Sequence, residues 1–337
     1  GCVSQVGERS RSIARDVVLA SSLPESVPAV SIDRQCGSSQ QALHFAAQAV
    51  MSGTMDVVVC AGVESMTRVP MGLPTSLPAQ NGYGDPKSPG VEARYPGVVF
   101  SQFEGAEAIA RKHGFDRETM DRFALESHQR ATRAQDAGAF DAEIVALDYV
   151  DAEGRTQRHL VDEGVRRNAT LEGIGGLQPI LEGGRMSAGS ASQICDGSAG
   201  LLVVNERGLK QLGVAPLARV HQMTVIGEDP VIMLEAPINA TRRALQKAGL
   251  KIEDIDLYEV NEAFASVPLA WLKELGADPE RLNVNGGAIA LGHPLGASGA
   301  KLMTTLIHAL KARGRRYGLQ TMCEGGGLAN VTIIEAL

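Results

Sequence analysis

The spacing of apolar residues predicts alternating strands and helices along most of the chain. Apolar residues run almost without a break through residues 56–62, which is typical of a strand covered on both faces of its sheet. At residues 38–51 they recur every three or four positions instead, as on one face of a helix. With a strand expected at residues 30–32, these segments form a strand–loop–helix–strand unit, which predicts parallel pairing with a right-handed crossover.

A second unit of the same kind is predicted near the end of the chain. Its parts are a short strand at residues 282–285, a glycine-rich loop around His293, a helix at residues 297–312 and a strand at residues 318–323. Cys-Ala-Gly at residues 60–62 and Cys-Glu-Gly at residues 323–325 stand at matching points of the two units. We interpret the repeat as a diverged internal duplication, and two unrelated α/β units are the alternative.

The middle of the chain, residues 67–185, follows a different pattern. Proline and glycine dominate residues 70–97, which are too irregular for a packed sheet. Helical patterns follow at residues 104–113 and 117–138. We interpret this region as a long insertion that covers a site and sets its selectivity. Beyond it, the pattern predicts a strand at residues 199–204 and a helix at residues 239–249.

Length and charge narrow the class of protein. The 337 residues fit two or three subdomains rather than one small core. A formal net charge of −7 gives no electrostatic reason to bind nucleic acid, which favours a basic surface. No apolar stretch approaches the roughly 20 residues that span a bilayer. We therefore expect a soluble globular enzyme with neither nucleic acid nor a membrane as its partner.

The cysteines indicate a reducing compartment. There are 5, an odd number, and none is arranged as Cys-x-x-Cys, so neither disulfides nor a metal site are expected. A cytoplasmic protein with reduced thiols fits best. The opening Gly-Cys-Val is similar to the end of a strand, and we expect residues upstream of Gly1, where a targeting signal would also stand.

Cys36 is the candidate nucleophile. It stands immediately before a predicted helix, where free N–H groups and the helix dipole favour a negative charge. That position would help a thiol of ordinary pKa, ~8.5, to lose its proton. The Gly-Ser-Ser that follows lets a substrate approach closely. A small buried structural thiol is the alternative.

Three other residues complete a candidate site. His293 is the one histidine in a glycine-rich loop and could take the thiol proton, or it could simply bond within its loop. Cys323 precedes three glycines whose backbone N–H groups suit an oxyanion hole, although a core thiol is possible. Asn261 could hold a polar partner or cap a turn. His44 and His308, which fall within predicted helices, are expected to be structural.

Four motifs give the chain a resemblance to the thiolase family over essentially its whole length. In order, they are Cys-Gly-Ser-Ser-Gln-Gln-Ala from Cys36, Asn-Glu-Ala-Phe from Asn261, Gly-His-Pro-Leu-Gly-Ala-Ser-Gly around His293, and Cys-Glu-Gly-Gly-Gly from Cys323. The resemblance implies an α/β thiolase fold, in which duplicated βαβαβαββ halves form five layers, α-β-α-β-α, with an inserted loop domain. It implies an N-terminal half at residues 1–66 and 186–206, an inserted domain for substrate and CoA at residues 67–185, and a C-terminal half at residues 207–337.

The resemblance further implies an acyltransferase that cleaves 3-ketoacyl-CoA with CoA as co-substrate and no permanently bound cofactor. Cys36 would form the acyl thioester after His293 activates it, and the backbone N–H of Gly325 would help to hold the oxyanion. His293 and a water held by Asn261 would stabilise the enolate, which Cys323 would protonate. A homodimer or homotetramer is also implied.

Binding residues are implied by the same resemblance. They are Ser192 and Ala188 at the pantetheine arm, Phe264 in the acyl pocket, Arg166 at the CoA phosphates and Gln102 at the lid. For Arg166, an ordinary solvated position on the surface is the alternative. Ser-Gln-Phe at residues 101–103 stands where thiolases restricted to acetoacetyl-CoA typically carry His-Met-Gly. This departure favours a degradative enzyme for longer or bulkier, even sterol-derived, acyl groups over an acetoacetyl-CoA thiolase working in the condensing direction. Two other classes of protein fit less well. A decarboxylating ketoacyl synthase would have no role for Cys323. A catalytically inactive acyl-CoA-binding relative would lack at least one of the four motif residues, all of which are present here.

Overall fold

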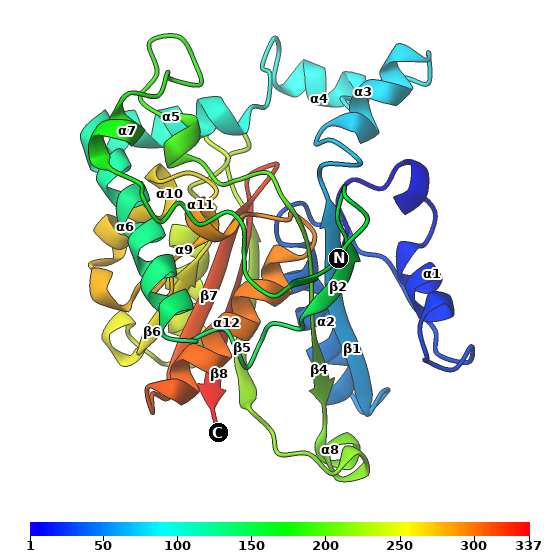
Figure 1. Ribbon diagram of the computed structural model, residues 1–337. Coiled ribbons are helices and arrows are strands. Elements are labelled where there is room, and N and C mark those ends of the chain that lie inside the picture. The colour runs from blue at the N-terminus through cyan, green and yellow to red at the C-terminus, as the bar shows by residue number, and fades with distance from the viewer.

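The computed structural model describes residues 1–337, and its centre is two sheets with a pair of helices packed between them (Figure 1). The larger sheet has the strand order β5-β8-β7-β6, in which only β6 and β7 run parallel. Its strands are β5 (Ala218–Gly227), β6 (Leu257–Val260), β7 (Tyr317–Glu324) and β8 (Leu328–Ala336). The smaller sheet pairs β1 (Val57–Ser65) with β4 (Asp196–Val204) in antiparallel register.

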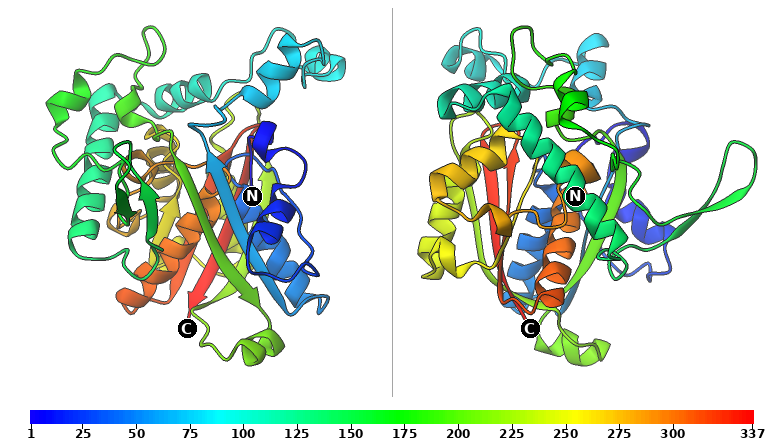
Figure 2. Two further views of the ribbon diagram at one scale, coloured as in Figure 1. Left: turned by 45° about the vertical axis from the view of Figure 1, so that its right-hand side comes forward. Right: turned by 60° about the vertical axis from the view of Figure 1, so that its left-hand side comes forward.

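The central helices are α2 (Ser38–Met51) and α12 (Ser298–Ala312), which agree with the predicted ranges. They pack against each other and against both sheets, as the right-hand view of Figure 2 shows. Their first turns meet because residue 299 is glycine: a Cβ on Gly299 would lie 2.2 Å from the backbone nitrogen of Gln40. The hydroxyl of Ser39 also accepts a hydrogen bond from the backbone N–H of Ala300 at 2.9 Å. This contact brings the loops that carry Cys36 and His293 toward each other.

Outer helices complete the layers. The helices α9 (Ala236–Ala248) and α10 (Ser266–Leu275) cover the far face of the larger sheet, where Tyr258 packs on Trp271. The short helix α1 (Ile13–Ala20) lies on the outer side of the smaller sheet (Figures 1 and 2). The order α-β-α-β-α confirms the predicted α/β fold class. The outer helix α1 covers the smaller sheet only in part, since the cross-strand pair Val59 and Leu202 remains 55% and 53% exposed.

Two strand predictions were wrong, and a third was right about the strand but wrong about its cover. Residues 56–62 form a strand, but the exposure of Val59 shows that one face of it is open. Residues 30–32 form no regular strand: the carbonyl of Ile32 accepts from the N–H of Cys2 at 3.0 Å, while Gly1 pairs with Val63 of β1. The first residues of the chain thus lie between the two segments that were expected to pair. Residues 282–285 make only a single bridge, between Leu282 and Tyr258.

Residues 67–185 hold α3 (Leu73–Gln80), α4 (Pro89–Arg94), α5 (Gln102–His113), α6 (Arg117–Asp136), the hairpin of β2 (Leu147–Val150) and β3 (Thr156–His159), and α7 (Leu171–Gly175). Of these, helices α3, α4, α5 and α7 lie at one end of the layered core, and α6 runs down its side (Figure 1). The remaining helices are α8 (Glu206–Leu212), α11 (Ala288–Leu291) and the 3-10 turns Gly7–Arg9, Ala188–Ser190, Ile252–Asp254 and Pro279–Arg281. As predicted, residues 70–97 hold no strand, and α3 and α4 bury no residue.

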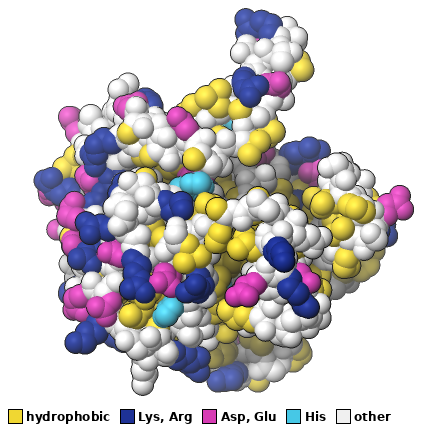
Figure 3. All heavy atoms as spheres, turned by 90° about the horizontal axis from the view of Figure 1, so that it is seen from below, with side chains coloured by type: hydrophobic (Ala, Val, Ile, Leu, Met, Phe, Trp, Pro, Cys, Tyr) yellow, Lys and Arg dark blue, Asp and Glu magenta, His cyan; other side chains and the backbone are white.

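Charged side chains of both signs are mixed on the face of the molecule seen from below (Figure 3). Basic and acidic side chains are interspersed over the lower face of the molecule, where no extended basic surface lies (Figure 3). None of the helices is both long enough and apolar enough to cross a bilayer.

Candidate active site

Cys36 lies in a tight turn that leads directly into α2, and it is partly exposed. The preceding residue, Gln35, has a φ of 49°, in the left-handed region that non-glycine residues rarely adopt. The Ser38 hydroxyl closes the turn, because it accepts from the N–H of Arg34 at 2.9 Å and donates to the carbonyl of Gln35 at 2.6 Å. The sulfur is therefore held at the start of the helix by a turn with defined hydrogen bonds.

This turn is docked on the end of β7, which carries Cys323. Nε of Arg34 lies 2.8 Å from the carboxylate of Glu324. A Cβ on Gly325 would lie 2.9 Å from the side-chain oxygen of Gln35, so the two segments approach each other closely. The structure thus brings the turn of Cys36 against the Cys-Glu-Gly motif at the other end of the chain.

The two thiols influence each other. Burial, followed by the charge of Cys36, raises the pKa of the Cys323 thiol well above its ordinary value. Burial and then the charge of Glu324 raise the pKa of Cys36 to about 12, while the backbone N–H groups of Cys36 and Gly325 lower it. Those two N–H groups therefore lie near the Cys36 sulfur. Burial outweighs the help expected from the helix start, so both thiols are protonated at neutral pH.

His293 is buried and its ring is held from two sides. Its backbone N–H donates to the carbonyl of Gln193 at 3.1 Å, and Gly292 before it has a φ of 80°. Nδ1 lies 2.5 Å from the hydroxyl of Ser298, and Nε2 lies 3.3 Å from Nδ2 of Asn261. Burial, helped by the charge of Lys301, lowers the pKa of His293 to about 3, so the ring is neutral near pH 7.

Asn261 follows β6 at the same end of the sheet as Cys323. Its N–H donates to the carbonyl of Thr321 at 3.1 Å, two residues before Cys323 on the neighbouring parallel strand. The carboxyl ends of parallel strands meet at one edge, where α/β proteins place their ligands. Oδ1 of Asn261 is buried and has no hydrogen-bond partner within the protein. It is therefore available to a water or a substrate atom.

Several residues that support the site were not predicted. The carboxylate of Glu64 accepts from the N–H groups of Val3 and Gly296, each at 2.9 Å, and from Arg9 at 2.6 Å. It thereby ties the His293 loop to the start of the chain. The buried Glu262 similarly anchors the Asn-Glu-Ala-Phe motif, because it accepts from Ser127, Asn283 and the N–H of Ile289. Ser298 could have been found from its place in the His293 loop, whereas nothing near Glu64 in the sequence marks its role.

The residues predicted to bind the acyl and pantetheine groups form a second cluster. The N–H of Ser192 donates to the carbonyl of Ala263 at 2.9 Å, which places Ser192 beside the buried Phe264. Phe264 meets the ring of Phe103 edge-on at 5.7 Å. Next to Phe103, Nε2 of Gln102 lies 3.7 Å from the sulfur of Met71.

The remaining predicted contacts lie on the surface. Ala188 is exposed in a 3-10 turn. Arg167 is engaged by Asp136 at 2.7 Å, whereas the exposed Arg166 forms no ion pair. Of the two arginines, Arg166 is therefore the one whose charge is free to meet a phosphate.

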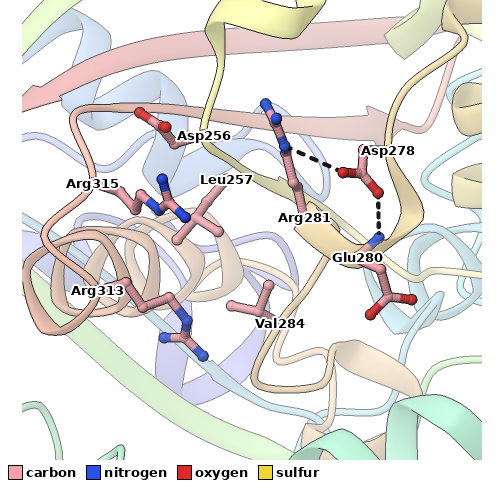
Figure 4. A pocket seen from close by; sticks show the side chains of 8 residues that line it. All are labelled: Asp256, Leu257, Asp278, Glu280, Arg281, Val284, Arg313 and Arg315. Atoms are coloured by element: carbon pink, nitrogen blue, oxygen red, sulfur yellow. Dashed lines mark hydrogen bonds and ion pairs between the residues drawn. The ribbon is translucent and has the colours of Figure 1, made fainter.

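A hollow of about 350 Å³ lies away from the thiols (Figure 4). It is lined by Asp256, Leu257, Asp278, Glu280, Arg281, Val284, Arg313 and Arg315. Asp256 precedes β6, whereas Asn261 follows it, so the hollow lies at the opposite end of that strand. Three arginines face three carboxylates there, and the balance of charge gives no basis for binding an anionic substrate.

Comparison with known proteins gives consistent matches along the whole chain. Residues 1–207 match the family model described as thiolase, N-terminal domain, and residues 214–336 match thiolase, C-terminal domain. The chain is 52% identical to the steroid 3-ketoacyl-CoA thiolase FadA6 of Mycobacterium tuberculosis, over 100% of this chain and 82% of that protein. It is 43% identical to a 3-ketoacyl-CoA thiolase of Cronobacter sakazakii, over 99% of this chain and 85% of the relative.

Solved structures agree with these matches. Human mitochondrial 3-ketoacyl-CoA thiolase superposes with a TM-score of 0.88 at 36% sequence identity. The superposition includes 100% of this chain and 86% of the human chain. The acetyl-CoA acetyltransferase of Bacillus anthracis superposes with a TM-score of 0.89, also at 36% identity, with the same coverage of 100% and 86%. The human enzyme has also been solved in complex with CoA, and that structure superposes with a TM-score of 0.86 at 36% identity, covering 100% of this chain and 85% of its own.

Proposed function

Because the chain belongs to the thiolase family, we propose that it is a degradative 3-ketoacyl-CoA thiolase, an acyltransferase that uses CoA to cleave a 3-ketoacyl-CoA into acetyl-CoA and a shortened acyl-CoA. One observation carries the proposal: Cys36 and Cys323, from opposite ends of the chain, lie close enough for the charge of one sulfur to shift the pKa of the other. The cleavage needs both an acyl carrier and a separate proton donor, and two adjacent thiols supply them.

The first half of the reaction uses Cys36 as nucleophile. The neutral Nε2 of His293 takes the thiol proton, and the sulfur adds to the 3-keto carbon, whose oxygen accepts from the N–H groups of Cys36 and Gly325. When the carbonyl re-forms, the bond between carbons 2 and 3 breaks, and its electron pair becomes the enolate of acetyl-CoA. His293, now protonated, and a water held by Asn261 stabilise that enolate. Cys323 then delivers its proton to carbon 2, and acetyl-CoA leaves.

The second half restores the enzyme. The Cys323 thiolate takes the proton of an incoming CoA thiol, and the CoA sulfur attacks the acyl thioester on Cys36. The carbon–sulfur bond to Cys36 breaks, the shortened acyl-CoA leaves, and the Cys36 sulfur regains its proton from His293. CoA is thus a co-substrate, and its phosphates, pantetheine arm and acyl group are assigned to Arg166, to Ser192 with Ala188, and to Phe264 with Gln102.

The acyl group is of the longer or bulkier kind. Gln102 stands at the lid, where its amide contacts Met71, and it belongs to the Ser-Gln-Phe that replaces the His-Met-Gly of thiolases restricted to acetoacetyl-CoA. The 52% identity to a protein named steroid 3-ketoacyl-CoA thiolase supports a ring-containing substrate. The alternative is an acetoacetyl-CoA thiolase in the condensing direction, which the likeness to an acetyl-CoA acetyltransferase favours. Thiolysis rates on C4, C8–C16 and steroid-type 3-ketoacyl-CoA thioesters separate the two, and a strict C4 preference would favour the alternative.

The nucleophile is tested with Cys36→Ala, and Cys195→Ala is the matched control because Cys195 is the other partly exposed cysteine. We expect Cys36→Ala to abolish both thiolysis and the mass increase of the acyl-enzyme, and Cys195→Ala to retain both. Full activity in a folded Cys36→Ala protein would overturn the assignment.

The cysteines and one exposed apolar face support proposals for the compartment and the assembly of the protein. All five cysteines are unpaired, which supports a reducing compartment such as the cytoplasm. The open apolar face at Val59 and Leu202 supports association into a homodimer or homotetramer. Analytical ultracentrifugation of the purified protein measures the assembly directly, and a monomer would contradict it.

A further inference from the structure

Glu324 is a buried carboxylate between the two catalytic thiols. It follows Cys323 directly in β7, and it is 0% exposed. A Cβ on Gly37, the residue after Cys36, would lie only 2.2 Å from Oε1 of Glu324. Glycine at residue 37 therefore lets the carboxylate sit directly beneath the turn of the nucleophile.

Arg34 is the only cation paired with this carboxylate. Nε of Arg34 lies 2.8 Å from Oε2 of Glu324, and the arginine side chain is 20% exposed. Besides this ion pair, the backbone N–H of Asn330 lies near the carboxylate and lowers its pKa. An unpaired carboxylate in such a site would be costly, because burial penalises the charged form.

The position has a consequence for both sulfurs. From Glu324, a single negative charge acts on Cys36 and on Cys323, and it favours the protonated form of each thiol. Cys323 has to carry a proton when the enolate forms, and Cys36 has to keep its proton until His293 removes it. A carboxylate beside both thiols supports both requirements.

We infer that Glu324, paired with Arg34, is a positioning residue of the reaction: it holds the Cys36 turn against the strand end that carries Cys323, and when it is ionised its charge opposes the ionisation of both thiols. The inference rests on the proposed function and deepens it. The charged and titratable groups that face the pair are Cys36, Cys323, Asp33 on the turn itself and His44 on α2.

The charge of Glu324 depends on pH. Burial raises the pKa of Glu324 to about 8, and the guanidinium of Arg34 opposes this rise. The carboxylate is therefore ionised above about pH 8, which includes the pH range of the alkylation test below. Removing the charge by Glu324→Gln, which keeps the shape, should lower the pKa of Cys36. Removing the cation by Arg34→Gln leaves the carboxylate unpaired in contact with the turn, and it loosens the hold on Glu324.

The test is the pH dependence of Cys36 alkylation by iodoacetamide, read by peptide mass spectrometry so that the five cysteines are distinguished. We expect Glu324→Gln to alkylate about tenfold faster than the parent between pH 8.5 and 9.5, the change for about one pKa unit. Glu335→Gln is the matched control, because Glu335 forms a similar pair with Arg316 at 2.8 Å on β8, far from the thiols, and it should leave the profile unchanged.

Arg34→Gln provides a second, independent measurement. We expect it to raise KM and lower kcat of thiolysis at pH 7.5, and we expect Arg34→Lys, which keeps the cation, to restore most of the rate. If a folded Glu324→Gln protein gives the parental alkylation profile, the inference is wrong. If Glu324→Gln does not fold, Arg34→Gln decides, and parental kinetics overturn the inference. The alkylation test does not depend on turnover, so it can fail without affecting the proposed function. The proposed function would be contradicted by a different result, namely a Cys36→Ala protein that is still active.

Discussion

Nδ2 of Asn261 lies 3.3 Å from Nε2 of His293, and the other ring nitrogen determines which of them donates. The Ser298 hydroxyl donates its proton to the carbonyl of Pro294 at 2.9 Å, so it can only accept from Nδ1 of His293, at 2.5 Å. The ring proton is therefore on Nδ1, and Nε2 presents a lone pair to the Asn261 amide. A neutral base with a fixed tautomer is held next to an amide whose oxygen is free.

Replacing Asn261 tests whether this amide serves the reaction. We expect Asn261→Ala to lower kcat of thiolysis about 10²–10³-fold, as the loss of one oxyanion donor does elsewhere, with little change in KM. Asn239→Ala is the control, because that amide bonds Glu228 on the exposed side of α9. Steady-state rates of both variants decide the matter, and a kcat of Asn261→Ala near the parental value would remove Asn261 from the mechanism.

Ser298 should act through the ring it holds. Ser298→Ala removes the acceptor of the Nδ1 proton, so we expect kcat to fall about fivefold, which corresponds to about 1 kcal/mol for one hydrogen bond. The matched control on the same helix is Thr304→Ala, whose hydroxyl donates to the carbonyl of Ala300 at 2.9 Å. Equal rates for the two variants would mean that Ser298 serves α12 and not His293.

The neutral state of His293 predicts a flat acid limb in the pH–rate profile. Burial lowers its pKa to about 3, so the base stays unprotonated as pH falls from 8 to 5. We therefore expect kcat/KM of thiolysis to show no loss with a pKa near 6.5. The profile should be measured over the pH range in which circular dichroism shows the fold to be intact. A titration near 6.5 that disappears in His293→Gln would show that the free enzyme holds a more solvated imidazole.

Periodicity was enough to predict the helices that build the site. The ranges of α2 and α12 were predicted almost to the residue, because each has a regular apolar face and a clear break at its ends. Strand partners were harder to predict, since hydrogen bonding between strands depends on residues far apart in the chain. The pairing of Gly1 with Val63 could not be read from the pattern around residues 30–32.

The candidate site was predictable to the extent that its residues stand in short motifs. Cys36, Asn261, His293 and Cys323 each belong to one of four short motifs, and the structure places them at one edge of the core. The supporting charges were not predictable in this way. Glu64 and Glu324 act through contacts with Gly296 and Arg34, which no local spacing reveals, and the roles of the four motif residues remain predictions.

The glycines indicate why the two halves support each other. A Cβ on Gly62 in β1 would lie 2.2 Å from the carbonyl oxygen of Gly296 in the His293 loop. A Cβ on Gly325 after β7 would lie 2.9 Å from Gln35 in the Cys36 turn. Each strand thus touches the loop of the other half, as a duplicated arrangement requires. This reciprocity supports the interpretation of residues 60–62 and 323–325 as equivalent points.

Buried thiols predict that the fold loses stability in alkali, and Cys60 isolates the effect from catalysis. Burial in β1 raises the pKa of Cys60 to about 12 from an ordinary value of 9.0, and its thiol donates to the carbonyl of Ser39 at 3.4 Å. Below pH 9 this thiol is protonated in both the folded and the unfolded chain. Between pH 9 and about 12 only the unfolded chain ionises, so the free energy of unfolding falls by about 1.4 kcal/mol per pH unit for this group.

Urea unfolding at pH 8 and at pH 10.5 measures the fall in the free energy of unfolding. We expect Cys60→Ala to be less stable than the parent at pH 8, because it leaves a small cavity, but to lose less stability on going to pH 10.5. The other four cysteines also have raised pKa values, and they remain in both proteins, so their share of the fall cancels in the comparison. The burial of Cys60 between β1 and α2 should prevent its thiol from ionising in the folded chain. Equal losses of stability for the two proteins would contradict this, because they would mean that the thiol ionises as readily in the folded chain as in the unfolded one.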